Sequence, residues 1–194
     1  GGNCFDAAVG AVFTSMTSEF ALTSAGGGGS LLAFPNNSEP ILFDFFVNAL
    51  PPNEKSLNFF PVSVGFGSTK QIFNIGKGSI AVPGNVAGLL HVQNRLGVLS
   101  LKAVLEPAIS IAKTGIIINK TQEFLIKILE PILTFDSYGK SIFKPQGVLV
   151  RLGERIIFPK FAEFLTRLSV EGADFFYKNM GADFLVSLAN NGGL

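Results

Sequence analysis

The chain has 194 residues, of which 47% are hydrophobic and 15% charged, a composition typical of a folded protein with a sizeable core and unlike that of a disordered one. A formal net charge of +1 gives no basic surface for nucleic acid or an anionic membrane, and no apolar run is long enough to span a bilayer. A single Cys and a single His exclude an internal disulfide and leave too few ligands for a metal centre, so we expect neither a metal nor a cofactor.

The first part of the chain predicts a helix followed by a glycine-rich turn. Apolar residues recur at helical spacing over 5–13, and Asn3 stands where an N-terminal cap is favoured. Four consecutive glycines, Gly26 to Gly29, then interrupt any regular structure. Backbone N–H groups of such a run can cradle an anion, but no downstream Gly-Lys-Ser/Thr opens a helix. A tight structural turn therefore fits these glycines better than a phosphate loop.

Two short apolar runs follow the glycines, at 31–34 and 41–47. The segment 35–40 between them is rich in Pro, Asn and Ser, so the three segments together predict a β-hairpin. Both runs are apolar on both faces, which predicts that the hairpin is covered on both sides. Residues 48–80 contain two adjacent prolines and several glycines, and we expect them to be irregular.

The rest of the chain predicts helices, because apolar residues recur every three to four positions between Gly and Pro signals. The fold class is therefore α+β, a hairpin or sheet segment followed by a helical region. We find neither a repeat nor a linker, so residues 1–194 are expected to form a single domain. Five helices are predicted, over 83–96, 101–112, 124–132, 161–168 and 175–188, with Pro131 ending or kinking the third.

Several short motifs lie in a consistent order along nearly the whole chain, and together they resemble the large subunit of the γ-glutamyltransferase family. Each motif alone is weakly specific, but their order and spacing are not expected by chance. The motifs are Gly1–Val9 (GGNCFDAAV, similar to GGNAFDAAV), Gly26–Gly29 before an apolar strand, Ser79–Leu89 (SIAVPGNVAGL, similar to AVAVPGTVAGL), Glu106–Ile109 with Ala112 and Gly115, Phe176–Lys178, and Gly192–Leu194.

The resemblance implies the αββα sandwich of N-terminal-nucleophile hydrolases. It also implies a precursor that cleaves itself and so exposes a threonine at the start of a small subunit. That threonine would attack a small amide or γ-glutamyl-like substrate, and the acyl-enzyme would pass its acyl group to water or an amine. Residues 1–194 would then be an incomplete portion of a large subunit, with no catalytic residue of their own. The family implies a periplasmic or secreted location; a cytoplasmic one remains open.

The resemblance also identifies a candidate substrate-binding strand, and there the chain departs from the family. The family reads L-D-F-R-E-T-A-P, in which the arginine can pair with a substrate α-carboxylate through two parallel hydrogen bonds. Here Phe43–Leu50 reads FDFFVNAL, so Phe46 stands at the arginine position and Val47 at the following acidic one. By this correspondence the candidate substrate-binding residues are Phe46, Asp44 and Asn48.

Two interpretations of this departure remain open. Phe46 either marks a branch that acts on a different amide, or is a core residue of a buried strand while another group anchors the carboxylate. Asp44, taken as buried, either braces the strand or the glycine loop or contacts substrate. His91 is expected at a helix surface or boundary, outside any Ser-His-Asp triad. The alternatives to a γ-glutamyl enzyme are an amidase for a non-glutamyl substrate and a catalytically silent binding or assembly protein.

Overall fold

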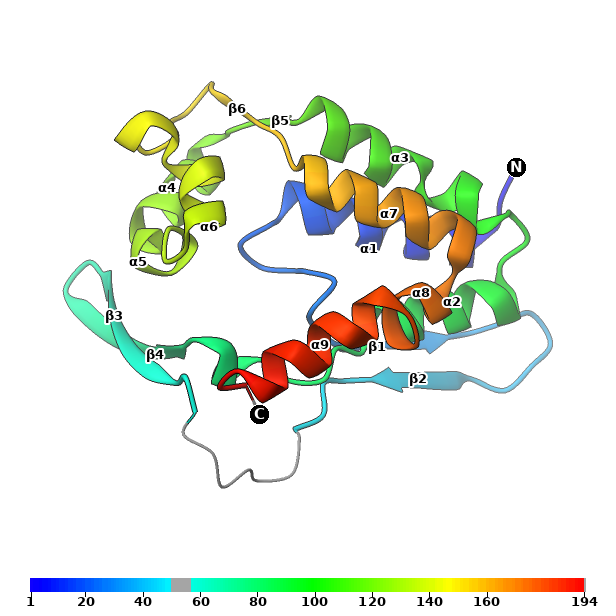
Figure 1. Cartoon of the computed structure of the whole chain (residues 1–194). Coiled ribbons are helices and arrows are strands. Elements are labelled where there is room, and N and C mark those ends of the chain that lie inside the picture. Colours follow the sequence, from blue (N-terminus) through cyan, green and yellow to red (C-terminus); the bar gives the residue numbers. More distant parts are fainter. Residues whose placement is uncertain (50–56, 194) are drawn as a thin grey trace.

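The computed structural model describes residues 1–49 and 57–193, apart from the side chains of Met180 and Ala189. Helices and small antiparallel sheets alternate along the chain, which confirms the α+β class (Figure 1). The helices are α1 (Cys4–Ser18), α2 (Asn85–Leu96), α3 (Leu101–Thr114), α4 (Lys120–Ile128), α5 (Glu130–Leu133), α6 (Ser137–Phe143), α7 (Pro159–Glu171), α8 (Ala173–Tyr177) and α9 (Met180–Asn190), with 3₁₀ turns η1 (Lys77–Ser79) and η2 (Pro145–Gly147). The strands are β1 (Gly29–Ala33), β2 (Ile41–Phe45), β3 (Phe60–Phe66), β4 (Thr69–Ile75), β5 (Ile116–Ile117) and β6 (Arg155–Ile156).

Helix α1 begins at the predicted cap. Asn3 Oδ1 accepts hydrogen bonds from the backbone N–H groups of Phe5 (2.9 Å) and Asp6 (3.0 Å). Asp6 Oδ2 accepts in return from the Asn3 N–H at 2.7 Å, which completes a capping box. The predicted helix is thus confirmed, and it buries Val9 and Phe13 completely.

The main core lies where α1, α3 and α7 pack side by side, with α2 and the β1–β2 hairpin on the other side of α1 (Figure 1). The core includes side chains from all of these elements: Val9, Phe13, Phe43, Val86, Leu89, Leu105, Ile109, Leu165 and Leu168. A second cluster lies around α4, α6 and the β5–β6 pair and contains Ile118, Ile126, Phe143, Val150, Ile156 and Phe158. The main core uses the apolar faces that helical spacing predicted, whereas the second cluster draws mainly on residues outside those faces, such as Ile126, Phe143 and Ile156.

The predicted hairpin is confirmed, with β1 and β2 antiparallel from Gly29↔Phe45 to Ala33↔Ile41. The prediction that both faces of this hairpin are covered is wrong, because within residues 1–49 and 57–193 other elements cover only one face. Ala33 and Phe43 face the core, but Leu32 is 57% exposed and its cross-strand partner Leu42 is 65% exposed. One face of the sheet therefore packs on helices, and the other presents apolar side chains to solvent.

The prediction of irregular structure over 48–80 is also wrong where the structure describes it, because β3 and β4 form an antiparallel hairpin. The sequence does carry a signal, since Phe60, Val62, Val64 and Phe66 alternate at the two-residue period of a strand. Gly67, at φ 67°, then allows the two-residue turn that joins the strands. The adjacent prolines that favoured irregular structure lie within 50–56, outside the described residues.

The C-terminal helices differ from prediction in detail. The helix expected over 175–188 is divided into α8 and α9, because the start of α9 packs directly on α8: a Cβ at Gly181 would overlap the Phe176 carbonyl. The helix expected over 124–132 ends at Ile128, and Pro131 lies in the separate α5, as a proline in a helical pattern predicts. Helix α6 and the short β5–β6 pair were not predicted.

Candidate functional site

The candidate substrate-binding strand borders an open groove of about 640 Å³ between β2 and α2. This volume falls within the usual range for small-molecule sites. All three predicted site residues line the same groove, together with residues of α2. The lining consists of Ile41 to Phe46 and Asn48 from the strand side, Pro83 and Gly84 from the preceding loop, and Ala87, Gly88, His91 and Arg95 from α2.

Glycines of the VPGNVAG segment let α2 approach β2 at Phe45. A Cβ at Gly88 would overlap the Phe45 ring, and one at Gly84 would overlap the Phe45 carbonyl oxygen. Gly28, in the glycine run, is as close to the same strand, since its Cβ would lie 2.5 Å from the Val47 nitrogen. Neither Gly28 nor its neighbours in the run has a positive φ, so Gly28 serves close packing. The predicted turn is confirmed at the start of the run, where the Gly27 N–H donates to the Ser24 carbonyl at 3.2 Å, while Gly29 already belongs to β1.

Backbone hydrogen bonds then fix the loop, the helix start and the strand end to one another. The Gly27 carbonyl accepts from the N–H groups of Gly84 (3.0 Å) and Asn85 (2.9 Å), the first residues of the α2 region. Asn48 and Val82 form an isolated antiparallel bridge, in which Val82 N–H donates to the Asn48 carbonyl at 2.8 Å. The end of β2 is therefore held by the family-like motifs on either side of it.

Asp44 braces the end of its own strand. Its side chain is exposed, and Oδ1 accepts a hydrogen bond from the Phe46 backbone N–H at 3.1 Å. The expectation of a buried carboxylate is thus wrong, because alternation along β2 places Asp44 on the open face of the sheet. An exposed carboxylate with one local hydrogen bond retains acceptor capacity for a ligand.

Phe46 lies on the same open side as Asp44, and its side chain is 68% exposed. The interpretation of Phe46 as a core residue of a buried strand is therefore wrong. Asn48 is exposed as well, while Val47 is only partly so. Phe46 thus presents an aromatic ring to the groove at the position of the family's arginine; Leu50 lies outside the described residues.

Two cationic or titratable side chains of α2 line the groove opposite the strand. His91 is exposed, as predicted, and its ring meets the Phe43 ring edge-on at 5.7 Å. The Arg95 guanidinium lies one turn further along α2 and also sits 5.7 Å from the Phe43 ring centre. Sequence reasoning missed Arg95. Its four-residue spacing from His91, on the helix face that continues Gly84 and Gly88, was the available signal.

Residues 1–49 and 57–193 contain no cluster of three or more His, Cys, Asp or Glu side chains placed to hold a metal ion. None of the helices within those ranges combines the length and apolar character needed to cross a bilayer.

Solved structures with this architecture define the class of fold. The chain superimposes on *Helicobacter pylori* γ-glutamyltranspeptidase with a TM-score of 0.83 at 26% identity, over all of this chain and 55% of that one. It superimposes on the *Bacillus anthracis* transpeptidase CapD with a TM-score of 0.77 at 25% identity, over 98% of this chain and 57% of that one. The predicted N-terminal-nucleophile hydrolase fold is confirmed.

Sequence comparison gives the family. The γ-glutamyltranspeptidase family model matches residues 1–194, and the chain belongs to this family. It is 28% identical to glutathione hydrolase proenzyme 2 of *Schizosaccharomyces pombe*, covering all of this chain and 31% of that protein. It is 27% identical to the glutathione hydrolase proenzyme of *Escherichia coli* K12, covering all of this chain and 33% of that one. The chain therefore spans about a third of the length of these relatives.

Proposed function

We propose that the complete protein is an amide hydrolase or acyltransferase of the γ-glutamyltranspeptidase type, and that residues 1–194 are one domain of its large subunit. The observation that carries this proposal is the family match along the whole chain. The packing of the matching motifs supports it, since the VPGNVAG segment and the glycine run enclose the end of the candidate strand.

The nucleophile in this proposal is an N-terminal threonine outside the chain. Its hydroxyl attacks the amide carbonyl while its own amine takes the hydroxyl proton; the amine then passes that proton to the substrate nitrogen, which leaves as the C–N bond breaks and the acyl-enzyme ester remains. Water or a second amine then attacks the acyl-enzyme. The residues described here do not perform these steps. Their role is to hold the strand end, with Asp44, Phe46 and Asn48 toward the substrate.

The partner in this proposal is the remainder of the same precursor, which covers the turn end of the open face of the β1–β2 hairpin, away from Phe46. Leu32, Phe34 and Leu42 are each 57–66% exposed. Leu32 and Leu42 are paired across the strands, so they form a contiguous apolar surface. An exposed sheet face of this kind is typical of an interaction surface. The matched relatives are about three times longer and several are named proenzymes, which supports a covering segment from the same precursor.

The acyl group is proposed to differ from a simple γ-glutamyl group. Phe46 offers no donor to an α-carboxylate, and each lost charge-assisted hydrogen bond is worth about 1.5–3 kcal/mol. A site that lacks both bonds is therefore expected to bind a γ-glutamyl substrate more weakly than a site with the arginine, by a factor on the order of a hundred or more. Arg95 and His91 are the basic side chains that line the same groove, so any substrate carboxylate would be anchored there, on the α2 side.

The experiment uses the full-length gene product. Sequencing its processed chains is expected to give a second polypeptide that begins with Thr, and an electrophilic glutamine analogue is expected to label that residue covalently. A precursor that is never processed and never labelled would instead support the silent binding or assembly protein on this scaffold. A third outcome would support the proposal that the acyl group differs from γ-glutamyl: the threonine is labelled, non-glutamyl amides are turned over rapidly, and a γ-glutamyl anilide is turned over slowly.

A further inference from the structure

We propose that a second cavity, separate from the groove along β2, binds the aliphatic chain of a small carboxylic acid, with Lys77 at the carboxylate. The cavity has a volume of about 290 Å³ and lies between α9 and the loop that leads into α2. This volume is near the lower end of the range for small-molecule sites, so it suits a short ligand.

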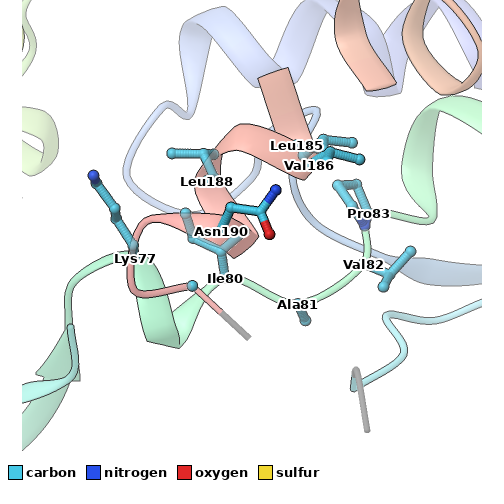
Figure 2. Close-up of a pocket in the computed structure, with 10 residues that line it drawn as sticks. Lys77, Ile80, Ala81, Val82, Pro83, Leu185, Val186, Leu188 and Asn190 are labelled. Atoms are coloured by element: carbon cyan, nitrogen blue, oxygen red, sulfur yellow. The ribbon is translucent and has the colours of Figure 1, made fainter. Parts of the chain in front are cut away.

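The chemistry of the lining indicates the class of ligand. Leu185, Val186 and Leu188 contribute aliphatic side chains from α9, and Ile80, Val82 and Pro83 contribute them from the facing loop. Lys77 and Asn190 are the two lining residues with polar side chains. Figure 2 shows Lys77 at one end of the cavity, Val82 and Pro83 at the other, and Leu188 and Asn190 between them. Because one cationic side chain lies beside an aliphatic cavity, the lining suits a ligand with a single negative charge at the end of a hydrocarbon chain.

The Lys77 end of the cavity is held by Asn58, which joins η1 to the segment after α9. The Asn58 N–H donates to the Gly192 carbonyl at 2.8 Å. In return, Asn58 accepts from two backbone groups of η1: its carbonyl from Gly78 N–H (3.0 Å) and its Oδ1 from Lys77 N–H (3.0 Å). The Lys77 backbone is thus fixed, while its side chain is exposed.

The other end of the cavity is held by Tyr177 of α8. Its hydroxyl donates to the Pro83 carbonyl at 2.8 Å and accepts from the Ala87 N–H at 3.2 Å. Burial raises the pKa of Tyr177, so the hydroxyl stays protonated and continues to donate. With both ends fixed by hydrogen bonds, the cavity is preorganised, which lowers the cost of binding.

Lys77 is available for a ligand. The ion pairs between described residues use Lys127, Lys144, Arg167 and Lys178, and none involves Lys77. In Figure 2 the Lys77 side chain extends away from the other lining residues. Because the ammonium is a compact point charge on a flexible stem, it can turn toward a carboxylate at the cavity mouth. The Asn190 amide supplies a further donor for the same group.

The experiment measures binding of octanoate and of octanol to the full-length protein by titration calorimetry. Octanoate is expected to bind with a Kd below about 1 mM, and octanol several-fold more weakly because it lacks the charge. Lys77→Met keeps the apolar stem and is expected to weaken octanoate binding about threefold to tenfold while leaving octanol unchanged. Leu185→Trp, which adds bulk to the α9 side of the lining, is expected to abolish binding of both.

Lys102→Met is the matched control, since Lys102 is an exposed lysine on α3 remote from the cavity lining. It is expected to bind octanoate like the wild type. The proposal is overturned if octanoate fails to bind at about 10 mM, if octanol binds equally well, or if Lys77→Met has no larger effect than Lys102→Met. None of these readouts depends on turnover, so they are independent of the proposed enzymatic activity.

Discussion

Asp6 Oδ1 accepts a hydrogen bond of 2.6 Å from the side-chain amide of Gln93, 87 positions further along the chain. The same oxygen accepts from the backbone N–H groups of Val98 and Leu99, both at 3.1 Å, while Oδ2 accepts from Asn3 N–H. One carboxylate thus joins the start of α1 to the end of α2 and the loop beyond it. Asp6, the aspartate of the family-like GGNCFDAAV motif, therefore has a structural role. No residue of this motif lines the groove between β2 and α2.

The acid dependence of stability follows from this network. Burial acts to raise the pKa of Asp6, but hydrogen bonds from Asn3, Gln93, Leu99 and Val98 outweigh it and lower the pKa to about 2. Because the unfolded carboxyl titrates near pH 4, the stabilisation is complete above that pH and is lost as the pH falls towards 2. Asp6→Asn is therefore expected to lower Tm by several degrees at pH 7.

The measurement is Tm against pH for the wild type, Asp6→Asn and the control Glu106→Gln, which alters an exposed carboxylate on α3. The gap between wild type and Asp6→Asn is expected to be constant above about pH 5 and to narrow between about pH 4 and pH 2. Glu106→Gln is expected to stay close to the wild type throughout. A gap that persists unchanged down to pH 2 would contradict this account of Asp6.

The contact between Gly88 and Phe45 predicts a second effect on stability. Gly88→Ala would drive a methyl group into the Phe45 ring and push α2 away from β2, at a cost of about 1–3 kcal/mol despite the better helix propensity of Ala. Gly65→Ala is the matched control, because a Cβ at Gly65 meets nothing within 4 Å. Denaturant unfolding is expected to give a change within about 0.5 kcal/mol for Gly65→Ala. If both substitutions changed the free energy of unfolding equally, the close approach of Gly88 to Phe45 would not be what stabilises the packing of α2 on β2.

The parts of the fold that the sequence predicted are those in which local chemistry and packing agree. Asn3, Val9 and Phe13 define a capped amphipathic helix whether or not the rest of the chain is considered. The β3–β4 hairpin was missed because the prolines and glycines around it outweighed a clear alternation of Phe and Val. The division between α8 and α9 depends on the contact of Gly181 with Phe176, which no periodicity expresses.

The candidate site was predictable only in part, for a similar reason. The alignment of motifs named Phe46, Asp44 and Asn48 as substrate-binding candidates, and the structure places all three along one groove; their contact with substrate stays a prediction. Their exposure was not predictable, because an apolar strand in isolation does not reveal which of its faces the chain itself covers. Arg95 was missed because its relation to Phe43 arises from the packing of α2 on β2, between residues more than fifty positions apart.

The hydroxyl of Tyr177 predicts a third effect, on the loop that the groove and the aliphatic cavity share. Tyr177→Phe removes the hydrogen bond to the Pro83 carbonyl and leaves the Ala87 N–H without this acceptor, at a cost of about 1–2 kcal/mol. Tyr138→Phe is the control, since within the described part of the chain the hydroxyl of Tyr138 makes no comparable bridge. In thermal unfolding experiments, Tyr177→Phe is expected to lower Tm by about 2–5 °C, and Tyr138→Phe is expected to leave it unchanged. An unchanged Tm for Tyr177→Phe would show that the Tyr177 hydroxyl does not stabilise this loop.

Phe46→Arg tests the specificity of the site itself. The side chain at this position is 68% exposed, so a guanidinium can be placed there without burying a charge, and it restores the planar pair of donors for an α-carboxylate. On the processed full-length protein, kcat/KM for a γ-glutamyl anilide is expected to rise by about tenfold to a hundredfold. Phe46→Lys is the matched control: it restores the charge without the paired donors and is expected to give a smaller rise. If the wild type already turns over the anilide rapidly and saturates at low substrate, Phe46 does not limit glutamyl binding, and the carboxylate anchor must be sought on the α2 side of the groove, at Arg95.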